Sequence, residues 1–213
     1  MTSGNGSASN ATVIDVLPIN AGAEDAQPQN DQPIFFFDLG SPYAWLVAER
    51  IGHFMPTALW QPVCAADLVN GPLWDGDRAR VERLASEFGV LAVRWPADIS
   101  AEDSLTLDTH QAMLVATFTK SIGRATSFAQ AAFRQIYNAG RSVTDTDTLL
   151  IAAAACELHP RAILQAIEMQ STKNALASAA ALARMHNVVS LPVVKVDGKL
   201  IDAEQLLALA ADA

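Results

Sequence analysis

The sequence predicts a mixed α/β fold, and three observations support that prediction. The apolar run Ile34–Phe37 is rich in β-branched and aromatic residues, which is typical of a short buried strand. Ser41 and Pro42 then form a helix-start signal, because a serine oxygen accepts a hydrogen bond from a free amide and proline needs no amide partner at the first helical position. Near the carboxyl terminus, residues 188–201 indicate two strands joined by an Asp-Gly turn. We therefore expect strands from both ends of the chain to form a core sheet.

The remaining elements follow from the spacing of the apolar residues. The first helix is expected to run from Pro42 to about His53, and residues 58–64 are expected to form a second strand parallel to the first. From about residue 75 to residue 187 the apolar residues recur mainly at helical spacing, with glycines and a proline between the segments. We expect the region 75–187 to be a helical subdomain inserted into the fold, and residues 204–211 to form a closing helix.

Composition and charge limit the domain organisation and the class of partner. Residues 1–32 are rich in Ser, Asn, Gly, Ala and Gln without sustained apolar periodicity, so we expect a disordered tail before a folded domain at 33–213. The formal net charge is −9 and no cluster of Lys and Arg is found, which argues against nucleic-acid binding. The first basic residue is Arg50 and no run of about 18 apolar residues occurs, so we expect neither a signal peptide nor a membrane span. A cytoplasmic protein is the resulting expectation.

Two motifs resemble those of a known family. The motif Asp38-Leu39-Gly40-Ser41-Pro42-Tyr43 after the aromatic strand, together with Leu191-Pro192 before the hairpin, is similar to the 2-hydroxychromene-2-carboxylate isomerase and kappa-class glutathione transferase family. The resemblance covers about residues 34–211 and implies a thioredoxin-like, DsbA-like core sheet with an inserted helical subdomain. It also implies that glutathione is the cofactor and that a small molecule is the substrate, and homodimers occur in that family.

The resemblance assigns roles to residues around the first helix. In that family the helix-starting serine replaces the first cysteine of a redox pair, so Ser41 would orient and stabilise the thiolate of bound glutathione without forming a covalent bond. Pro42 stands beside it, and Leu191 before a cis Pro192 would pair through its backbone with the peptide-like glutathione. Each of these residues also has a structural interpretation, because serine caps helices routinely and a proline can simply begin a strand.

Further binding residues are implied at positions that depart from the family motif. The family carries an Asp-Arg pair at the start of the last helix, where the acid receives the γ-glutamyl ammonium group. This chain has Glu204-Gln205 there, and Asp202 competes for the role. Acidic residues are also common in a first helical turn because of the helix dipole. Tyr43 and Asn70 are the candidates for binding the substrate, which the resemblance implies is an unsaturated, aromatic-derived acid.

The cysteines and histidines bear on the alternative functions. Cys64 and Cys156 form no Cys-x-x-Cys pair, and Ala44 stands where a second redox cysteine would be, so dithiol exchange at this motif is excluded. The four histidines are scattered without metal-ligand spacing, so no metal is expected. We therefore expect a glutathione-dependent isomerase or transferase. Two alternatives stay open: a non-catalytic DsbA-like binding module, and a thiol-disulfide oxidoreductase that acts through Cys64.

Overall fold

The mixed α/β fold predicted from the sequence is confirmed by the computed structural model. The structure describes residues 1, 32–68, 72–99 and 107–213. Asp31–Ala213 form one compact unit. The expected tail at 1–32 lies outside the described residues apart from its two end positions.

Within the described residues the sheet has four strands in the order β2-β1-β3-β4. Their bounds are β1 Ile34–Phe37, β2 Leu59–Pro62, β3 Val193–Val196 and β4 Lys199–Ile201. Strand β1 pairs in parallel with β2 and antiparallel with β3, and β3 pairs antiparallel with β4. The sheet therefore contains strands from both ends of the domain. The predicted parallel second strand is confirmed, although it is shorter than the expected range of 58–64.

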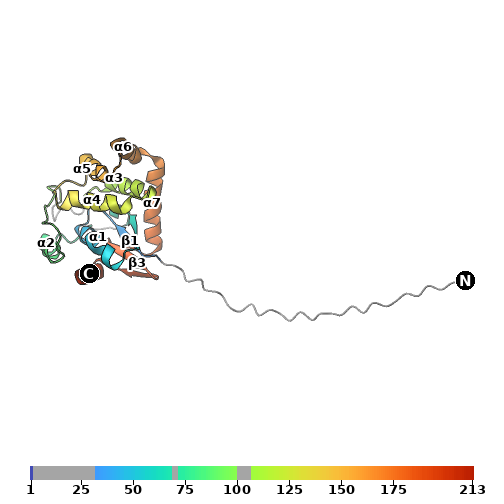
Figure 1. Cartoon of the computed structure of the whole chain (residues 1–213), viewed down its shortest axis with the longest axis horizontal. Coiled ribbons are helices and arrows are strands. Elements are labelled where there is room, and N and C mark those ends of the chain that lie inside the picture. The colour runs from blue at the N-terminus through green and yellow to red at the C-terminus, as the bar shows by residue number, and fades with distance from the viewer. Residues whose placement is uncertain (2–31, 69–71, 100–106) are drawn as a thin grey trace. The chain divides into compact units, whose positions relative to one another are not determined.

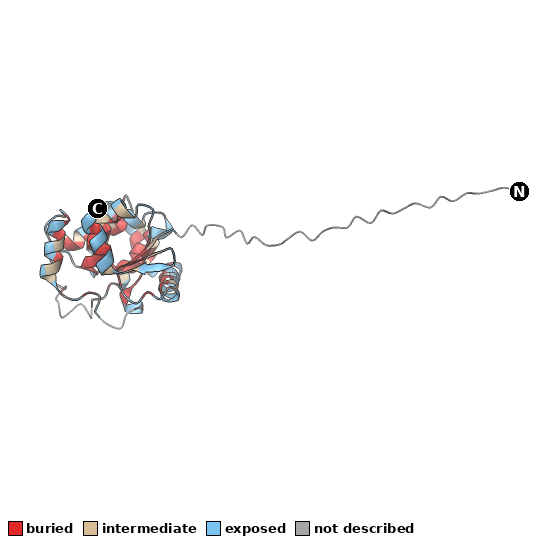
Figure 2. Cartoon of the chain, turned by 90° about the horizontal axis from the view of Figure 1, so that it is seen from below, coloured by how far each residue is buried: buried red, intermediate tan, exposed pale blue. Residues whose placement is uncertain are grey.

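Strand β1 is buried because its three consecutive phenylalanines fill both sides of the sheet. Successive side chains of a strand point to opposite faces. Phe35 and Phe37 pack edge-on against the ring of Trp60 in the larger hydrophobic cluster. Phe36 belongs to a second cluster, which includes Ala180 and Val193. Figure 2 shows the buried residues concentrated around the sheet and on the inward sides of the helices.

Helices make up the rest of the described regular structure, as the sequence predicts for the region between the second strand and the hairpin. Helix α1 (Pro42–Phe54) connects β1 to β2, and helix α8 (Ala203–Asp212) closes the chain in contact with α1. The elements between β2 and β3 are η1 Ala65–Asp67, α2 Arg78–Glu87, α3 His110–Ser121, α4 Ala125–Tyr137, α5 Thr146–Ala154, α6 Pro160–Glu168 and α7 Gln170–Met185. Figure 1 shows α3, α4, α5 and α6 gathered on one side of the domain and the carboxyl terminus on the other.

The hairpin between β3 and β4 turns at Asp197 and Gly198. Both residues have positive φ, 48° for Asp197 and 72° for Gly198. Two-residue hairpin turns that follow the twist of their strands require this conformation, and Asp-Gly is a favoured pair for it. The Asp-Gly turn predicted from the sequence is therefore confirmed.

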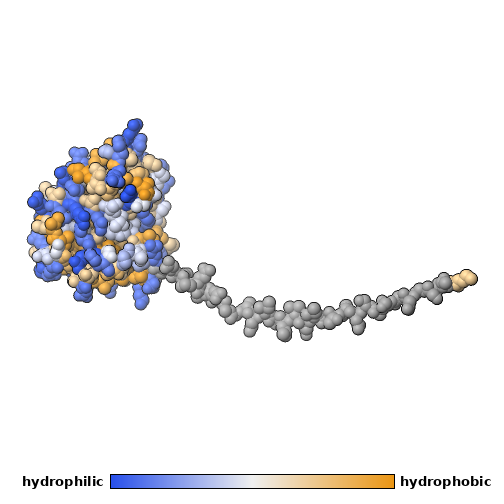
Figure 3. All heavy atoms as spheres, in the orientation of Figure 1, coloured by the Kyte–Doolittle hydropathy of each residue, from blue (hydrophilic) through white to orange (hydrophobic). Residues whose placement is uncertain are grey.

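The surface of the described residues is mixed in character. Figure 3 shows hydrophilic and hydrophobic residues interspersed on the face that it presents. Large exposed apolar side chains include Leu91, Met185 and Val189. None of the described helices combines the length and the hydropathy needed to cross a membrane.

Candidate functional site

Ser41 lies at the junction between β1 and α1. It is the N-cap residue of α1, where its Oγ accepts a hydrogen bond from the backbone N of Ala44 at 3.2 Å, and Pro42 occupies the first helical position. The backbone N of Ser41 donates to the carbonyl oxygen of Asp38 at 3.1 Å, which closes a turn after β1. The predicted Ser-Pro helix start is confirmed. It places a hydroxyl group at the positive end of the α1 dipole.

The peptide bond between Leu191 and Pro192 is cis and immediately precedes β3. In the antiparallel register of β1 and β3, Phe36 lies opposite Val193, so the chain at Pro192 and Leu191 continues past the carboxyl end of β1. Ser41 follows that same end of β1. Both residues of the cis bond are buried. The fold therefore brings Ser41 and the cis Leu191–Pro192 bond, which are far apart in the sequence, to the same end of the two central strands.

Gly40, directly before Ser41, is packed so closely that a side chain there would have to displace its neighbours. A Cβ at this position would lie 2.7 Å from Thr109 Cγ2, 2.8 Å from Leu73 Cδ2 and 2.9 Å from Leu107 Cδ2. The side chains of Leu73, Leu107 and Thr109 therefore cover the chain where it enters α1. Ser41 itself has an exposed fraction of 0%.

Asp38 is a fully buried carboxyl group beside this turn. Its Oδ1 accepts a hydrogen bond from the backbone N of Gly40 at 2.9 Å. Its Oδ2 accepts from the backbone N of Ala65 and from Thr109 Oγ1, both at 2.8 Å. Burial raises the pKa of Asp38, and the three hydrogen bonds offset only part of that effect. Asp38 therefore ties the end of β1 to η1 and to the start of α3.

Cys64 lies next to this buried carboxyl group, directly before η1. Its Sγ is 3.9 Å from Thr109 Oγ1, and the thiol is free and buried. Burial raises the pKa of the Cys64 thiol to about 11, and the charge of Asp38 contributes in the same direction. Because the thiolate is the reactive form of cysteine, Cys64 is a weak nucleophile near neutral pH. Cys156 is also free and buried.

A second polar group surrounds Tyr43 in the first turn of α1. The Tyr43 hydroxyl donates to the carboxylate of Asp75, whose two oxygens lie 2.8 and 2.9 Å away. Arg80 Cζ lies 5.3 Å from the centroid of the Tyr43 ring, and Arg80 Nη2 forms an ion pair of 2.5 Å with Glu204 Oε2. The hydrogen bond to Glu204 raises the pKa of Arg80, while burial and then Asp75 raise the pKa of Tyr43. Arg80 therefore connects α2 with both α1 and α8.

The start of α8 distinguishes the two acidic residues that competed for one role. Asp202 is the N-cap: its Oδ1 accepts from the backbone N of Gln205 at 3.0 Å, and Gln205 Oε1 accepts from the backbone N of Asp202 at 3.2 Å. This reciprocal pair is a capping box, which satisfies amides at the helix start. The side chain of Glu204 is 68% exposed and reaches Arg80. Asp202 therefore serves the helix cap, whereas Glu204 forms the ion pair with Arg80.

The structure groups most of the predicted site residues around the start of α1. Those that it describes there are Ser41, Pro42, Tyr43, Leu191, Pro192 and, through its ion pair with Arg80, Glu204. Asn70 lies outside the described residues. Sequence reasoning missed Arg80 and Asp38. Arg80 gives no local signal because its partner Glu204 is 124 positions away, and a buried role for Asp38 becomes visible only when η1 and α3 fold against it.

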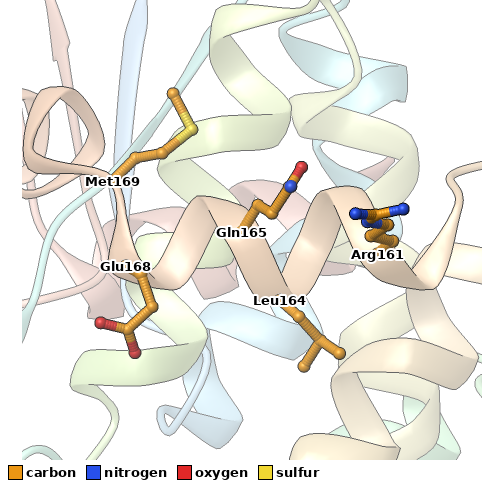
Figure 4. A pocket seen from close by; sticks show the side chains of 5 residues that line it. All are labelled: Arg161, Leu164, Gln165, Glu168 and Met169. Carbon is orange, nitrogen blue, oxygen red and sulfur yellow. The ribbon is translucent and has the colours of Figure 1, made fainter.

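Two surface pockets lie away from the start of α1. A pocket of about 490 Å³ is lined by side chains from α6 and the residue that follows it, and Figure 4 shows Arg161, Gln165 and Met169 projecting from this one segment. A second pocket of about 500 Å³ lies between α3 and α7, where Lys120 hydrogen-bonds to Gln61 Oε1. None of the predicted site residues that the structure describes lines either pocket. We assign the candidate site by its chemical groups rather than by the size of a cavity.

These features define the class of protein: a thioredoxin-like α/β fold in which a serine begins the first helix and a cis proline precedes the neighbouring strand. The chain belongs to the family of the DSBA-like thioredoxin domain, whose family model matches residues 74–212. The matched region contains the helical insertion, the hairpin and the closing helix. It does not include the segment that carries Ser41. No curated protein matches the sequence.

Solved structures extend the likeness over most of the domain. A 2-hydroxychromene-2-carboxylate isomerase is similar with a TM-score of 0.70 and 13% sequence identity, covering 84% of this chain and 93% of the isomerase. A cytosolic disulfide reductase DsbM from Pseudomonas aeruginosa, solved with GSH, has a TM-score of 0.59 and 13% identity over 84% of this chain and 94% of its own. A putative protein disulfide isomerase from Nitrosomonas europaea has a TM-score of 0.59 and 16% identity, with coverages of 85% and 96%. At these identities the likeness concerns the fold.

Proposed function

We propose that the protein uses reduced glutathione to isomerise or conjugate an unsaturated, aromatic-derived acid, as a 2-hydroxychromene-2-carboxylate isomerase or a kappa-class glutathione transferase does. The observation that carries the proposal is the position of Ser41: its hydroxyl lies at the start of α1, beyond the end of β1 that the cis Leu191–Pro192 bond also flanks. The similar fold of the isomerase and of the DsbM solved with GSH supports it. A cytoplasmic location is part of the proposal, because glutathione is kept reduced there.

Ser41 is suited to hold a sulfur anion. Its Oγ accepts from the backbone N of Ala44, so its own proton is available to donate to a thiolate. A hydrogen bond to a charged group contributes about 1.5–3 kcal/mol, and the amino terminus of α1 favours negative charge in the same place. When bound, glutathione supplies a thiolate that adds to the conjugated double bond, permits rotation about the resulting single bond and leaves with its electron pair, so no oxidant or reductant is consumed. Ser41 stabilises the anion and forms no covalent bond.

The charged groups beside α1 fit the two ends of a γ-glutamyl group. Glu204 would receive the ammonium and Arg80 the α-carboxylate, in exchange for the ion pair that the two side chains form with each other. The side chain of Arg80 is 25% exposed and that of Glu204 is 68% exposed, so both are accessible from solvent. The cation thus comes from α2, whereas the resembling family has an arginine next to the acid in the sequence. The backbone at Leu191 would pair with the peptide part of the ligand.

The burial of Ser41 adds a requirement to the proposal. Because Ser41 exposes no surface, its hydroxyl meets a ligand only after neighbouring groups have moved. The same observation favours a second candidate function, a binding module of the same fold that performs no chemistry. A thiol-disulfide oxidoreductase acting through Cys64 has less support, because the thiol is buried and its pKa is raised to about 11.

An isomerisation assay separates the enzyme from the binding module. The absorbance of 2-hydroxychromene-2-carboxylate and of related unsaturated acids is followed with the full chain and reduced glutathione. S-methylglutathione, which lacks a free thiol, is the matched control ligand. We expect a protein-dependent rate that saturates with glutathione and is absent with S-methylglutathione. If glutathione binds but none of these acids is isomerised or conjugated, the chemistry is contradicted and the binding module is the better account.

A further inference from the structure

The fold brings together three metal-ligating side chains that the proposed function does not use. One ligand atom from each of Cys64, Asp67 and His110 lies within 4.8 Å of the others. The arrangement follows from two local structures. Cys64 is the N-cap of η1 and Asp67 is its last residue, and in a 3-10 turn side chains three positions apart lie one above the other. His110 is the first residue of α3, directly after Thr109, whose hydroxyl contacts Cys64 Sγ.

We propose that Cys64, Asp67 and His110 form a site for a divalent transition-metal ion of the zinc or cobalt type. A thiolate, an imidazole nitrogen and a carboxylate oxygen are the ligand atoms that Zn²⁺ takes in proteins. A tetrahedral ion with bonds of about 2.0–2.3 Å separates its ligand atoms by about 3.5 Å. Side-chain rotations that move the ligand atoms by about an ångström would therefore bring them to this separation. Three protein ligands leave a fourth position for water or a solute. The site is therefore of the open kind.

The surroundings favour a cation and give it a route of entry. The buried carboxyl group of Asp38 is next to Cys64, and the three hydrogen bonds that it accepts come from uncharged donors. Thr109 connects the two groups, since its Oγ1 donates to Asp38 and lies 3.9 Å from Cys64 Sγ. A bound cation would stabilise the ionised form of this buried carboxyl group. Asp67 and His110 are exposed, so an ion from solvent meets them before it reaches the buried sulfur.

The starts of the two contributing elements are held by hydrogen bonds. The backbone N of Asp67 donates to the carbonyl oxygen of Cys64 at 3.0 Å, which fixes the turn of η1. The backbone N of His110 donates to Asp108 Oδ1 at 3.0 Å, which fixes the first residue of α3. These bonds hold the backbone from which the ligand side chains project. The spacing of histidines and cysteines in the sequence does not indicate this site. Cys64 and Asp67 follow β2, whereas His110 begins a helix more than forty positions later.

Cobalt titration of the full-length, reduced protein tests the proposal in the absence of glutathione. A thiolate bound to Co²⁺ gives a ligand-to-metal charge-transfer band, and four-coordination gives intense visible bands. We expect both bands to saturate at a single site, to disappear in Cys64→Ala, and to require about tenfold more Co²⁺ in His110→Ala and in Asp67→Asn. Cys156→Ala and His53→Ala remove the same residue types elsewhere in the chain and should leave the titration unchanged.

Two results would overturn the proposal. One is the absence of a charge-transfer band in the wild type; the other is a band that persists unchanged in His110→Ala. His110 is exposed, so its truncation leaves the core intact and the second result stays interpretable even if Cys64→Ala folds poorly. Because no glutathione is present and no activity is measured, failure of the metal site leaves the proposed function unaffected, and failure of the proposed function leaves this titration unaffected.

Discussion

Arg80 on α2 and Glu204 on α8 form an ion pair of 2.5 Å, although 124 positions separate them in the sequence. The guanidinium group also lies 5.3 Å from the centroid of the Tyr43 ring, two residues after Ser41. The pair therefore places opposite charges beside the helix that begins at the candidate site. This arrangement supports our proposal that a zwitterionic γ-glutamyl group is recognised there.

Replacing Arg80 tests that recognition. In Arg80→Met we expect the dissociation constant of reduced glutathione to rise by about tenfold or more, because one charge-assisted hydrogen bond contributes about 1.5–3 kcal/mol. Cysteinylglycine, which lacks the γ-glutamyl group, should bind the variant and the wild type equally. Arg83→Met is the matched control, since Arg83 is exposed on the same helix. An equal loss of affinity for both ligands, or an equal effect of the two substitutions, would contradict a γ-glutamyl role for Arg80.

Two glycines near α1 give opposite predictions for stability. Gly40→Ala places a Cβ within 2.7 to 2.9 Å of three side chains, so we expect the free energy of unfolding to fall by about 1–3 kcal/mol. Gly52→Ala lies inside α1 with nothing within 4 Å of its Cβ, so we expect it to raise that free energy by up to about 1 kcal/mol. Urea unfolding of both variants measures the difference. An unchanged free energy of unfolding in Gly40→Ala would contradict close packing at this position and would mean that the side chains around Gly40 move aside at little cost.

The buried carboxyl group of Asp38 predicts a pH dependence of stability. Its pKa is raised in the folded state, so the folded protein holds the proton more tightly than the unfolded chain, in which the pKa is about 3.9. The stabilisation from this group is therefore complete below that value and is lost as the pH rises through the folded-state pKa. Relative to Asp38→Asn, which does not titrate, the wild type should lose stability over this window. A difference in unfolding free energy that stays constant from acid to neutral pH would contradict the raised pKa.

The parts of the fold that the sequence predicts are those with local signals. The composition of Ile34–Phe37 predicts a strand. Ser41 and Pro42 predict a helix start, because both residue types suit the first turn of a helix. The hairpin at Asp197 follows from the backbone conformation that its turn requires. Each of these depends on residues within a few positions of one another. The range 58–64 predicted for the second strand is wider than β2, which ends at Pro62, because the chain turns into η1 directly after Cys64.

The parts of the candidate site that the sequence does not predict depend on contacts between distant elements. Nothing near Arg80 indicates that it meets Glu204, and nothing near Asp38 indicates that Ala65 and Thr109 will donate to it. The competition between Asp202 and Glu204 is also decided by structure, because only the capping box shows which acid the helix start uses. Charged and polar residues gain such roles from contacts between elements that are distant in the sequence, and these contacts leave no periodic pattern of residues that could predict them.

Calorimetric titration of reduced glutathione into the wild type and Ser41→Ala, near neutral pH, tests the central proposal most directly. We expect saturable binding to the wild type and an affinity lower by about tenfold or more in Ser41→Ala, because the hydroxyl that stabilises the thiolate is missing. Ser178→Ala, an exposed serine on α7, is the control variant, and S-methylglutathione should bind the wild type and Ser41→Ala alike. No detectable binding of glutathione to the wild type, or an equal loss for both ligands in Ser41→Ala, would contradict a thiolate site at Ser41.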